Sequence, residues 1–199
     1  MKITTQMIKE LRDATGAGIL EAKKILEQVN GDFDMAVDEL RKKGAARAAK
    51  RADREASEGI VELYTHPGNR LGVMVELNCE TDFVARNEQF IALAHDLALH
   101  IAASAPRYIS KDEVAQEELD RELSVLRDQA LAEGRPQAVV DKIIEGRMRK
   151  FYEEVCLLEQ PFFKDESVTI NQLIVDNIRT IGENIRVRRF ARYALGEAL

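Results

Sequence analysis

The residues of this chain best suited to chemistry at a protein surface are Thr81, Asp82, Phe83 and Val84, which follow a predicted strand and precede a predicted helix. Short polar residues suit a turn or a helix cap, whereas Phe83 places a large apolar side chain where a turn is ordinarily polar. Exposed aromatic residues concentrate in the hot spots of interfaces, so Phe83 is a candidate anchor for a partner. The alternative is that Phe83 folds back into the core, and the residue types leave both interpretations open.

The strand that leads into this turn shows a period-two pattern. Its apolar residues fall on one side, with Asn78 and Glu80 on the other, which predicts a half-buried strand over residues 71–79. A second strand is predicted over residues 60–65. The turn-forming sequence of residues 66–69 should join the two strands as a hairpin. The residues expected on the buried side are Val73, Val75, Leu77 and Cys79.

Residues 1–43 predict three short amphipathic helices. Each carries one apolar stripe that it cannot bury alone, so the three should close a compact bundle. The expected helix caps and stops are Thr4 or Thr5, Gly16, and Asp32 or Asp34. The stripe of the second helix is expected to contain Ile19, Ala22, Leu26 and Val29, and that of the third Ala36, Val37 and Leu40.

Residues 44–57 are basic and rich in alanine, without a broad apolar stripe, and predict a basic helical tether. Residues 58–199 are expected to form the core and dimerisation domain. The formal net charge of −6 argues against a general nucleic-acid binder, whose affinity depends on many phosphate contacts. The local basic and acidic runs are interpreted as solvated helix faces.

The remaining elements complete an α+β fold, a small antiparallel sheet packed with helices and a helical hairpin. A helix is predicted over residues 88–103, and Ser110 and Glu113 have the spacing of a capping box that opens a highly charged helix. That helix should stop near Gly134, and Pro136 should begin its antiparallel partner. The last helix and the closing strand are expected over residues 170–181 and 184–194.

The sequence offers no constellation for catalysis or for binding a nucleotide. The histidines at positions 66, 95 and 100 are too scattered for a hydrolase site, and Cys79 and Cys156 match neither a disulfide framework nor a metal motif. The Gly16-Ala17-Gly18 segment has Glu21 where a dinucleotide fingerprint needs glycine, so it predicts a helix junction. We therefore expect no cofactor, no metal and no directly bound nucleotide.

No apolar run approaches the roughly 20 residues that a membrane-spanning helix needs, and the first residues are too polar for a signal peptide. We therefore expect a cytoplasmic protein that does not contact a membrane. Cysteine usage without a disulfide pattern agrees with a reducing compartment.

Four ordered segments resemble the elongation factor Ts family of guanine-nucleotide exchange factors. They are Leu11–Gly18, Thr81–Val84, Glu159–Phe162, and Ile181–Ile185 followed by residues 187–189. Together they span nearly the whole chain. The resemblance implies a ubiquitin-associated-like fold for the first three helices, elongation factor Tu as the partner, and promotion of GDP release from it during translation.

The resemblance also implies roles for individual residues. Asp82 and Phe83 would enter a cleft between helices of the partner's nucleotide-binding domain and displace groups that hold its magnesium ion. Thr81 would set the turn and Val84 would pack behind it. The amino-terminal bundle would dock on the same domain of the partner through Arg12, Gly16, Ala17 and Gly18.

Compared with the longer members of the family, this chain resembles a short form with one core subdomain in place of two. Short forms are expected to pair, so we expect a homodimer. Two other functions remain as alternatives: a helical-bundle adaptor that binds another protein, and an RNA-binding module that uses the basic tether. A small hydrolase is disfavoured because the chain lacks a paired nucleophile and base.

Overall fold

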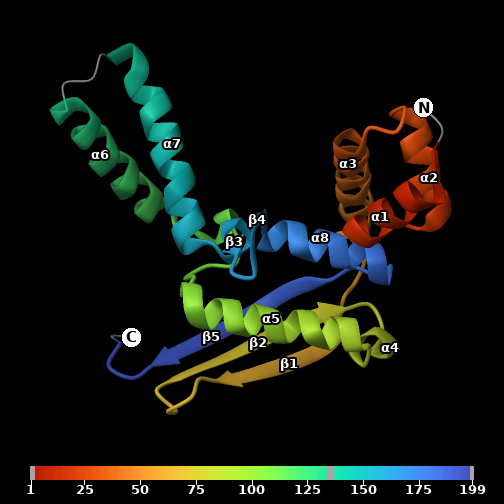
Figure 1. Cartoon of the computed structure of the whole chain (residues 1–199). Helices are drawn as coiled ribbons and strands as arrows, with labels where there is room; N and C mark the ends of the chain where they lie inside the picture. The colour runs from red at the N-terminus through yellow and green to blue at the C-terminus, as the bar shows by residue number, and fades with distance from the viewer. Residues whose placement is uncertain (1–2, 134–136, 198–199) are drawn as a thin grey trace. The chain divides into compact units, whose positions relative to one another are not determined.

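The structure is a computed structural model that describes residues 3–133 and 137–197, and it confirms the α+β class (Figure 1). An antiparallel three-stranded sheet has the order β1-β2-β5, so β2 is central and β5 lies at an edge. A small two-stranded sheet pairs β3 with β4. The strands are β1 (Glu58–Thr65), β2 (Leu71–Cys79), β3 (Pro161–Phe162), β4 (Asp165–Thr169) and β5 (Arg186–Ala194).

Contacts between residues group the chain into two compact units. The first unit contains Met1–Val61, Glu76–Ala94 and Gln172–Arg188. The second unit contains Glu62–Val75, His95–Asn171 and Arg189–Leu199. All the candidate site residues fall in the first unit. The domain boundaries drawn from the sequence, after residues 43 and 57, stay predictions.

The amino-terminal bundle consists of α1 (Thr5–Thr15), α2 (Ile19–Gln28) and α3 (Phe33–Arg51). Its caps follow the sequence prediction: Thr4 accepts a hydrogen bond from the backbone N–H of Met7 at 3.2 Å, and Asp32 accepts one from Met35 at 2.9 Å. Gly16 ends α1 with a φ of 64°, a conformation that glycine adopts without strain. The core of the bundle contains Leu11, Ala17, Ala22, Ile25, Leu26, Ala36 and Leu40.

The prediction of the bundle core is wrong for one residue. Ile19 was expected on the buried stripe of the second helix, but its side chain is 59% exposed. Ile19 is the first residue of α2, and the part of α2 that belongs to the core cluster begins one turn later at Ala22. The error therefore lies at the helix end, where the stripe extends beyond the packed core.

The third helix runs without a break through much of the predicted tether and ends at Arg51. The helix buries Gly44 and Ala48 in that region, so its contact surface is made of small residues. A Cβ atom on Gly44 would lie 3.4 Å from Cδ of Arg179, which belongs to α8 (Ile170–Ile181). Because glycine lacks that atom, α3 and α8 can approach closely here.

The buried side of β2 is as predicted, since Val73, Val75, Leu77 and Cys79 are all at most 4% exposed. The turn between β2 and α5 (Glu88–Ser104) contains one short helix, α4 (Asp82–Ala85). In each unit, part of α5 lies along part of the three-stranded sheet (Figure 1). The residues of α5 with the most deeply buried side chains are Phe90, Ala94, Leu97, Ala98, His100 and Ile101.

The predicted helical hairpin is present in the second unit as α6 (Gln116–Ala132) and α7 (Gln137–Val155). The predicted capping box does not open the charged helix. Ser110 instead precedes a 3₁₀ turn, η1 (Lys111–Glu113), that ends with Glu113, while Val114 and Ala115 are extended and separate that turn from α6. The predicted ends at Gly134 and Pro136 lie outside the described residues. A second 3₁₀ turn, η2 (Leu157–Glu159), follows α7.

Candidate functional site

Thr81 is the N-cap of the short helix that carries the candidate anchor. Its backbone is extended (φ −131°, ψ 155°), and its hydroxyl oxygen accepts a hydrogen bond from the backbone N–H of Val84 at 3.4 Å. The buried thiol of Cys79 donates to the Thr81 carbonyl at 3.2 Å. These contacts hold the end of the central strand and the start of α4 in a fixed turn.

Phe83 projects from this turn and is 80% exposed, so the alternative that it folds back into the core does not hold. The two residues that follow Phe83 are less accessible to solvent: Val84 is half-buried and Ala85 is buried. Asp82 forms an ion pair with Arg86 at 2.9 Å, and both side chains remain largely accessible to solvent. The turn therefore presents an aromatic ring and a carboxylate side by side at the surface.

A carboxylate from a distant part of the chain holds the turn. One oxygen of Glu183 accepts the backbone N–H groups of Glu80 and Thr81 at 3.1 and 3.0 Å. The other oxygen accepts the Thr81 hydroxyl at 2.7 Å. In return, Glu80 accepts the backbone N–H of Asn184 at 2.6 Å. The loop between α8 and β5 and the end of β2 are thus linked in both directions.

The second group of candidate residues lies at the junction of α1 and α2. Arg12 is exposed and forms an ion pair with Asp13 at 3.7 Å. Gly18 is the N-cap of α2, and a Cβ atom there would meet nothing within 4 Å. Ala17 is 4% exposed and belongs to the bundle core, so its side chain does not face a partner. The exposed surface of this junction is therefore formed by Arg12, Gly16 and Gly18.

Gly16 also makes a close internal contact with the last turn of α8. A Cβ atom at this position would lie 3.2 Å from Oγ1 of Thr180 and 3.6 Å from Nη2 of Arg179. Arg51 of α3 donates to the Ile178 carbonyl of the same helix at 3.0 Å. Among the described residues, the two candidate groups share no hydrogen bond or ion pair. Both nevertheless contact the end of α8 or the loop that follows it.

Two features of the surface were missed by the sequence analysis. Leu20 is 83% exposed next to Ile19, so the start of α2 presents two adjacent apolar side chains. A usable signal was present, because Leu20 falls outside the apolar stripe of its helix. The role of Glu183 was also missed. No local spacing reveals it, since its partners lie about 100 residues earlier.

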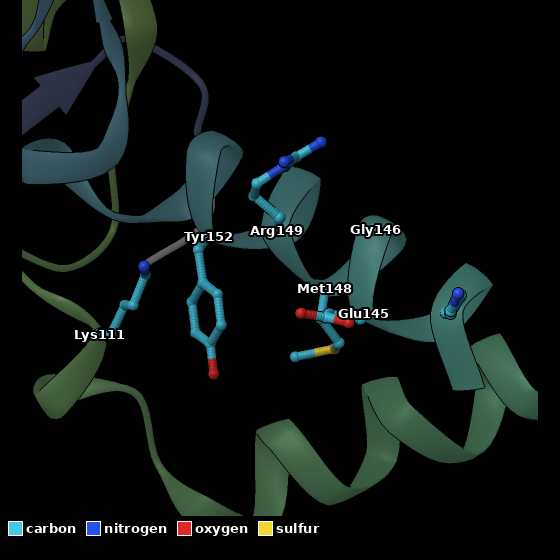
Figure 2. Close-up of a pocket in the computed structure, with 7 residues that line it drawn as sticks. Lys111, Glu145, Gly146, Met148, Arg149 and Tyr152 are labelled. Carbon is cyan, nitrogen blue, oxygen red and sulfur yellow. The ribbon is translucent and has the colours of Figure 1, made fainter.

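A hollow of about 640 Å³ lies in the second unit, where Lys111 lies beside α7, the second helix of the hairpin (Figure 2). Figure 2 shows the Lys111 amino group beside Tyr152, 5.2 Å from the centre of its ring. Two of the basic side chains that line the hollow already have carboxylate partners: Lys111 pairs with Glu159 at 2.8 Å, and Arg149 with Glu153 at 3.8 Å. We assign this hollow no role. Its lining is Lys111, Lys142, Glu145, Gly146, Met148, Arg149 and Tyr152.

The described residues contain no group of three or more histidine, cysteine, aspartate or glutamate side chains that could hold a metal ion. Cys79 and Cys156 are free and buried, and burial raises the pKa of each thiol to about 11. Neither thiol is therefore activated as a nucleophile near neutral pH. In the part of the chain that the structure covers, every helix is too short or too polar to cross a bilayer.

The chain is similar to proteins of one family along nearly its whole length. The family model described as elongation factor TS matches residues 2–197. Elongation factor Ts of Syntrophus aciditrophicus is 54% identical over 199 residues, which cover 100% of this chain and 99% of that protein. The proteins of the same name from Carboxydothermus hydrogenoformans and Syntrophomonas wolfei are 53% and 54% identical over 197 residues, 99% of this chain and 91% and 92% of theirs. The chain therefore belongs to the elongation factor Ts family and is a guanine-nucleotide exchange factor for elongation factor Tu in translation elongation.

Proposed function

We propose that this chain releases GDP from elongation factor Tu by placing the α4 turn, with Phe83 and Asp82, against the partner's nucleotide-binding domain. The observation that carries the proposal is the position of Phe83: an aromatic side chain 80% exposed on a turn whose backbone is held by Thr81 and Glu183. An exposed aromatic on a rigid support loses little conformational entropy on binding, which favours it as an anchor.

The exchange mechanism follows from linkage between two binding equilibria. If the chain binds the nucleotide-free partner more tightly than the GDP-bound partner, it must weaken GDP binding by the same factor. The chain need not touch the nucleotide, and it promotes exchange without catalysing a chemical reaction. In this proposal Phe83 fills a pocket in the partner, and the adjacent Asp82 carboxylate disturbs the groups that hold the magnesium ion.

The start of α2 provides the second docking surface. Arg12 and Gly18 were implied by the family resemblance, and Leu20 and Ile19 add two exposed apolar side chains beside them. An apolar pair beside an arginine has the composition of an interface centre, which is enriched in large apolar residues and arginine. We place this surface on the same domain of elongation factor Tu that receives the α4 turn. The core of the chain contacts another domain of the partner.

We also infer that two copies of the chain associate through the second unit. The edge strand β5 carries Tyr193, which is 68% exposed, and Leu195 beyond its end is 67% exposed. Leu63 and Met74 add further exposed apolar area in the same unit. Edge strands and apolar patches of this kind are usually covered by another surface. Light scattering should give the mass of a dimer at tens of micromolar, and a monomer would contradict this inference.

Family membership also supports a cytoplasmic site of action, because elongation factor Tu and the ribosome work there. The proposed function is tested by following the release of a fluorescent GDP analogue from elongation factor Tu in a stopped-flow experiment, with and without this chain. The expected result is release that accelerates in proportion to the amount of chain added. Release at the intrinsic rate would contradict the proposal and favour an adaptor that binds another protein.

A further inference from the structure

The loop between α8 and β5 contains a carboxylate whose described hydrogen bonds all go to the α4 turn. Glu183 accepts the backbone N–H groups of Glu80 and Thr81 and the Thr81 hydroxyl, at 3.1, 3.0 and 2.7 Å. Hydrogen bonds to a charged acceptor are about twice as strong as neutral ones. Three such bonds from one half-buried side chain fix both the direction and the rotation of the turn that leads into Phe83.

The next residue attaches the same loop to the chain that leaves the amino-terminal bundle. Asn184 is 4% exposed, and its side-chain amide donates to the carbonyl of Arg54 at 2.9 Å and to that of Ala52 at 3.4 Å. Its backbone N–H donates to Glu80 at 2.6 Å. The loop therefore has a support that does not depend on the Glu183 side chain.

We propose that Glu183 is a positioning residue for nucleotide exchange: it holds the α4 turn in the orientation in which Phe83 and Asp82 can enter the partner. This proposal deepens the proposed function and rests on it. Glu183 acts through Thr81 and does not itself contact the partner.

The physical reason is that α4 cannot hold its own shape. A helix of four residues is far shorter than the roughly 12 residues at which isolated helices become marginally stable. Its first turn depends on the Thr81 hydroxyl, and that hydroxyl is oriented by Glu183. Without the carboxylate, two backbone N–H groups in a half-buried position lose their acceptor, and the turn must move to satisfy them.

The test replaces Glu183 in two ways. Glu183→Ala should lower the exchange rate at limiting concentrations roughly 10-fold, which corresponds to about 1.4 kcal/mol. Glu183→Gln should restore most of the rate. Its amide oxygen can still accept both backbone N–H groups, and its amide nitrogen can donate to the Thr81 oxygen, which retains its bond to Val84. If charge alone mattered, both variants would be equally slow, and that result would overturn the positioning role.

A matched control separates positioning from loss of stability. Glu118 in the second unit is bound in a similar way: its carboxylate accepts a hydrogen bond from the Tyr108 hydroxyl at 2.5 Å and pairs with Arg107 at 2.6 Å. Glu118→Ala should lower the melting temperature without changing the exchange rate of the folded protein. Melting temperature and exchange are measured on the same samples. If Glu183→Ala slows exchange only in proportion to its unfolded fraction, the proposal is overturned.

A double mutant shows whether Glu183 acts through Phe83. If it does, adding Glu183→Ala to Phe83→Ala should slow exchange by clearly less than the roughly 10-fold effect of Glu183→Ala alone, because the turn has lost one of the two groups that it positions. Multiplying effects would overturn the proposal. Normal exchange by Phe83→Ala would instead overturn the proposed function. A slow Phe83→Ala protein together with a normal Glu183→Ala protein would overturn only the positioning role.

Discussion

Glu183 and Thr81, 102 residues apart in the sequence, are joined by two hydrogen bonds: the backbone N–H and the hydroxyl of Thr81 both donate to the Glu183 carboxylate, at 3.0 and 2.7 Å. Because Thr81 also caps α4, this contact sets the start of the turn that exposes Phe83. Exchange activity should therefore respond to substitutions in the turn and in its distant support, by more than the unfolded fraction of each variant explains.

Replacing Asp82 by alanine should slow GDP release, and the effect should shrink as magnesium is lowered. The reason is that a carboxylate acting against the magnesium site matters less when the ion is scarce. Stopped-flow release at several magnesium concentrations measures this. The control is Arg86→Ala, which breaks the Asp82–Arg86 ion pair but keeps the carboxylate. An exposed pair of this kind contributes only about 0.3–0.5 kcal/mol, so Arg86→Ala should leave release nearly unchanged. Equal effects of both substitutions would contradict the assigned role.

Replacing Leu20 by serine should weaken the complex with nucleotide-free elongation factor Tu by roughly 10-fold, or about 1.4 kcal/mol. Leu20 is 83% exposed, so the melting temperature should not fall. Titration calorimetry with the purified partner measures the affinity. Val125→Ser on α6, where the side chain is 44% exposed, is the matched control and should bind normally. Identical affinities for the two variants would mean that the start of α2 is not part of the interface.

The sequence predicted those parts of the fold that depend on local physics. The caps at Thr4 and Asp32, the glycine stop at Gly16 and the buried side of β2 follow from neighbouring residues, and all are confirmed. The capping box at Ser110 failed because the two residues after the 3₁₀ turn are extended, which spacing alone does not reveal.

The candidate site was predicted only in part, for a related reason. Whether Phe83 is exposed depends on what packs behind its turn, and Glu183 holds that turn from a loop about 100 residues away. A pattern within the turn contains no information on that partner. The exposure of Ile19 likewise depends on where the neighbouring helices stop covering α2. Local sequence therefore indicated which residues could act, but not which of them the fold exposes.

Gly59 should be among the residues that tolerate substitution least. Its φ of 149° suits glycine, and a Cβ atom there would lie 2.1 Å from the carbonyl oxygen of Leu77 on the neighbouring strand. Gly59→Ala should cost roughly 2–4 kcal/mol of unfolding free energy, measured by urea denaturation. Gly146→Ala is the control: a Cβ atom there meets nothing within 4 Å, and helix propensity should stabilise it by up to about 1 kcal/mol. Similar stabilities would contradict this account.

The buried His100 should make stability depend on pH. Its Nε2 is 2.9 Å from Oε1 of Gln160, whose amide nitrogen donates to the carbonyls of Glu154 and Ser104. The glutamine oxygen is thereby directed at the ring, so Nε2 carries the proton and Nδ1 is left without a hydrogen-bond partner. Protonating Nδ1 would create a buried cation. Burial therefore lowers the pKa of His100 below the ordinary value of 6.5.

The sign follows from proton linkage. The folded state binds the His100 proton more weakly than the unfolded state. The contribution of neutral His100 to the free energy of unfolding is therefore complete above pH 6.5 and is lost as the pH falls toward the lowered pKa. Urea unfolding between pH 8 and about pH 5 measures it. His100→Gln should show a shallower loss than the unmodified chain. Equal slopes for the two proteins would contradict the assignment.

The central claim is that Phe83 acts in the partner and not in the core, and Phe83→Ala tests it most directly. Melting temperature and stopped-flow GDP release are measured on the same preparation, with Phe163→Ala, a partly exposed aromatic in the second unit, as control. The account predicts a melting temperature within about 2 °C of the unmodified chain and a loss of roughly 30-fold or more in affinity for nucleotide-free elongation factor Tu, about 2–4 kcal/mol. A folded Phe83→Ala protein that promotes GDP release from elongation factor Tu at the normal rate would contradict it.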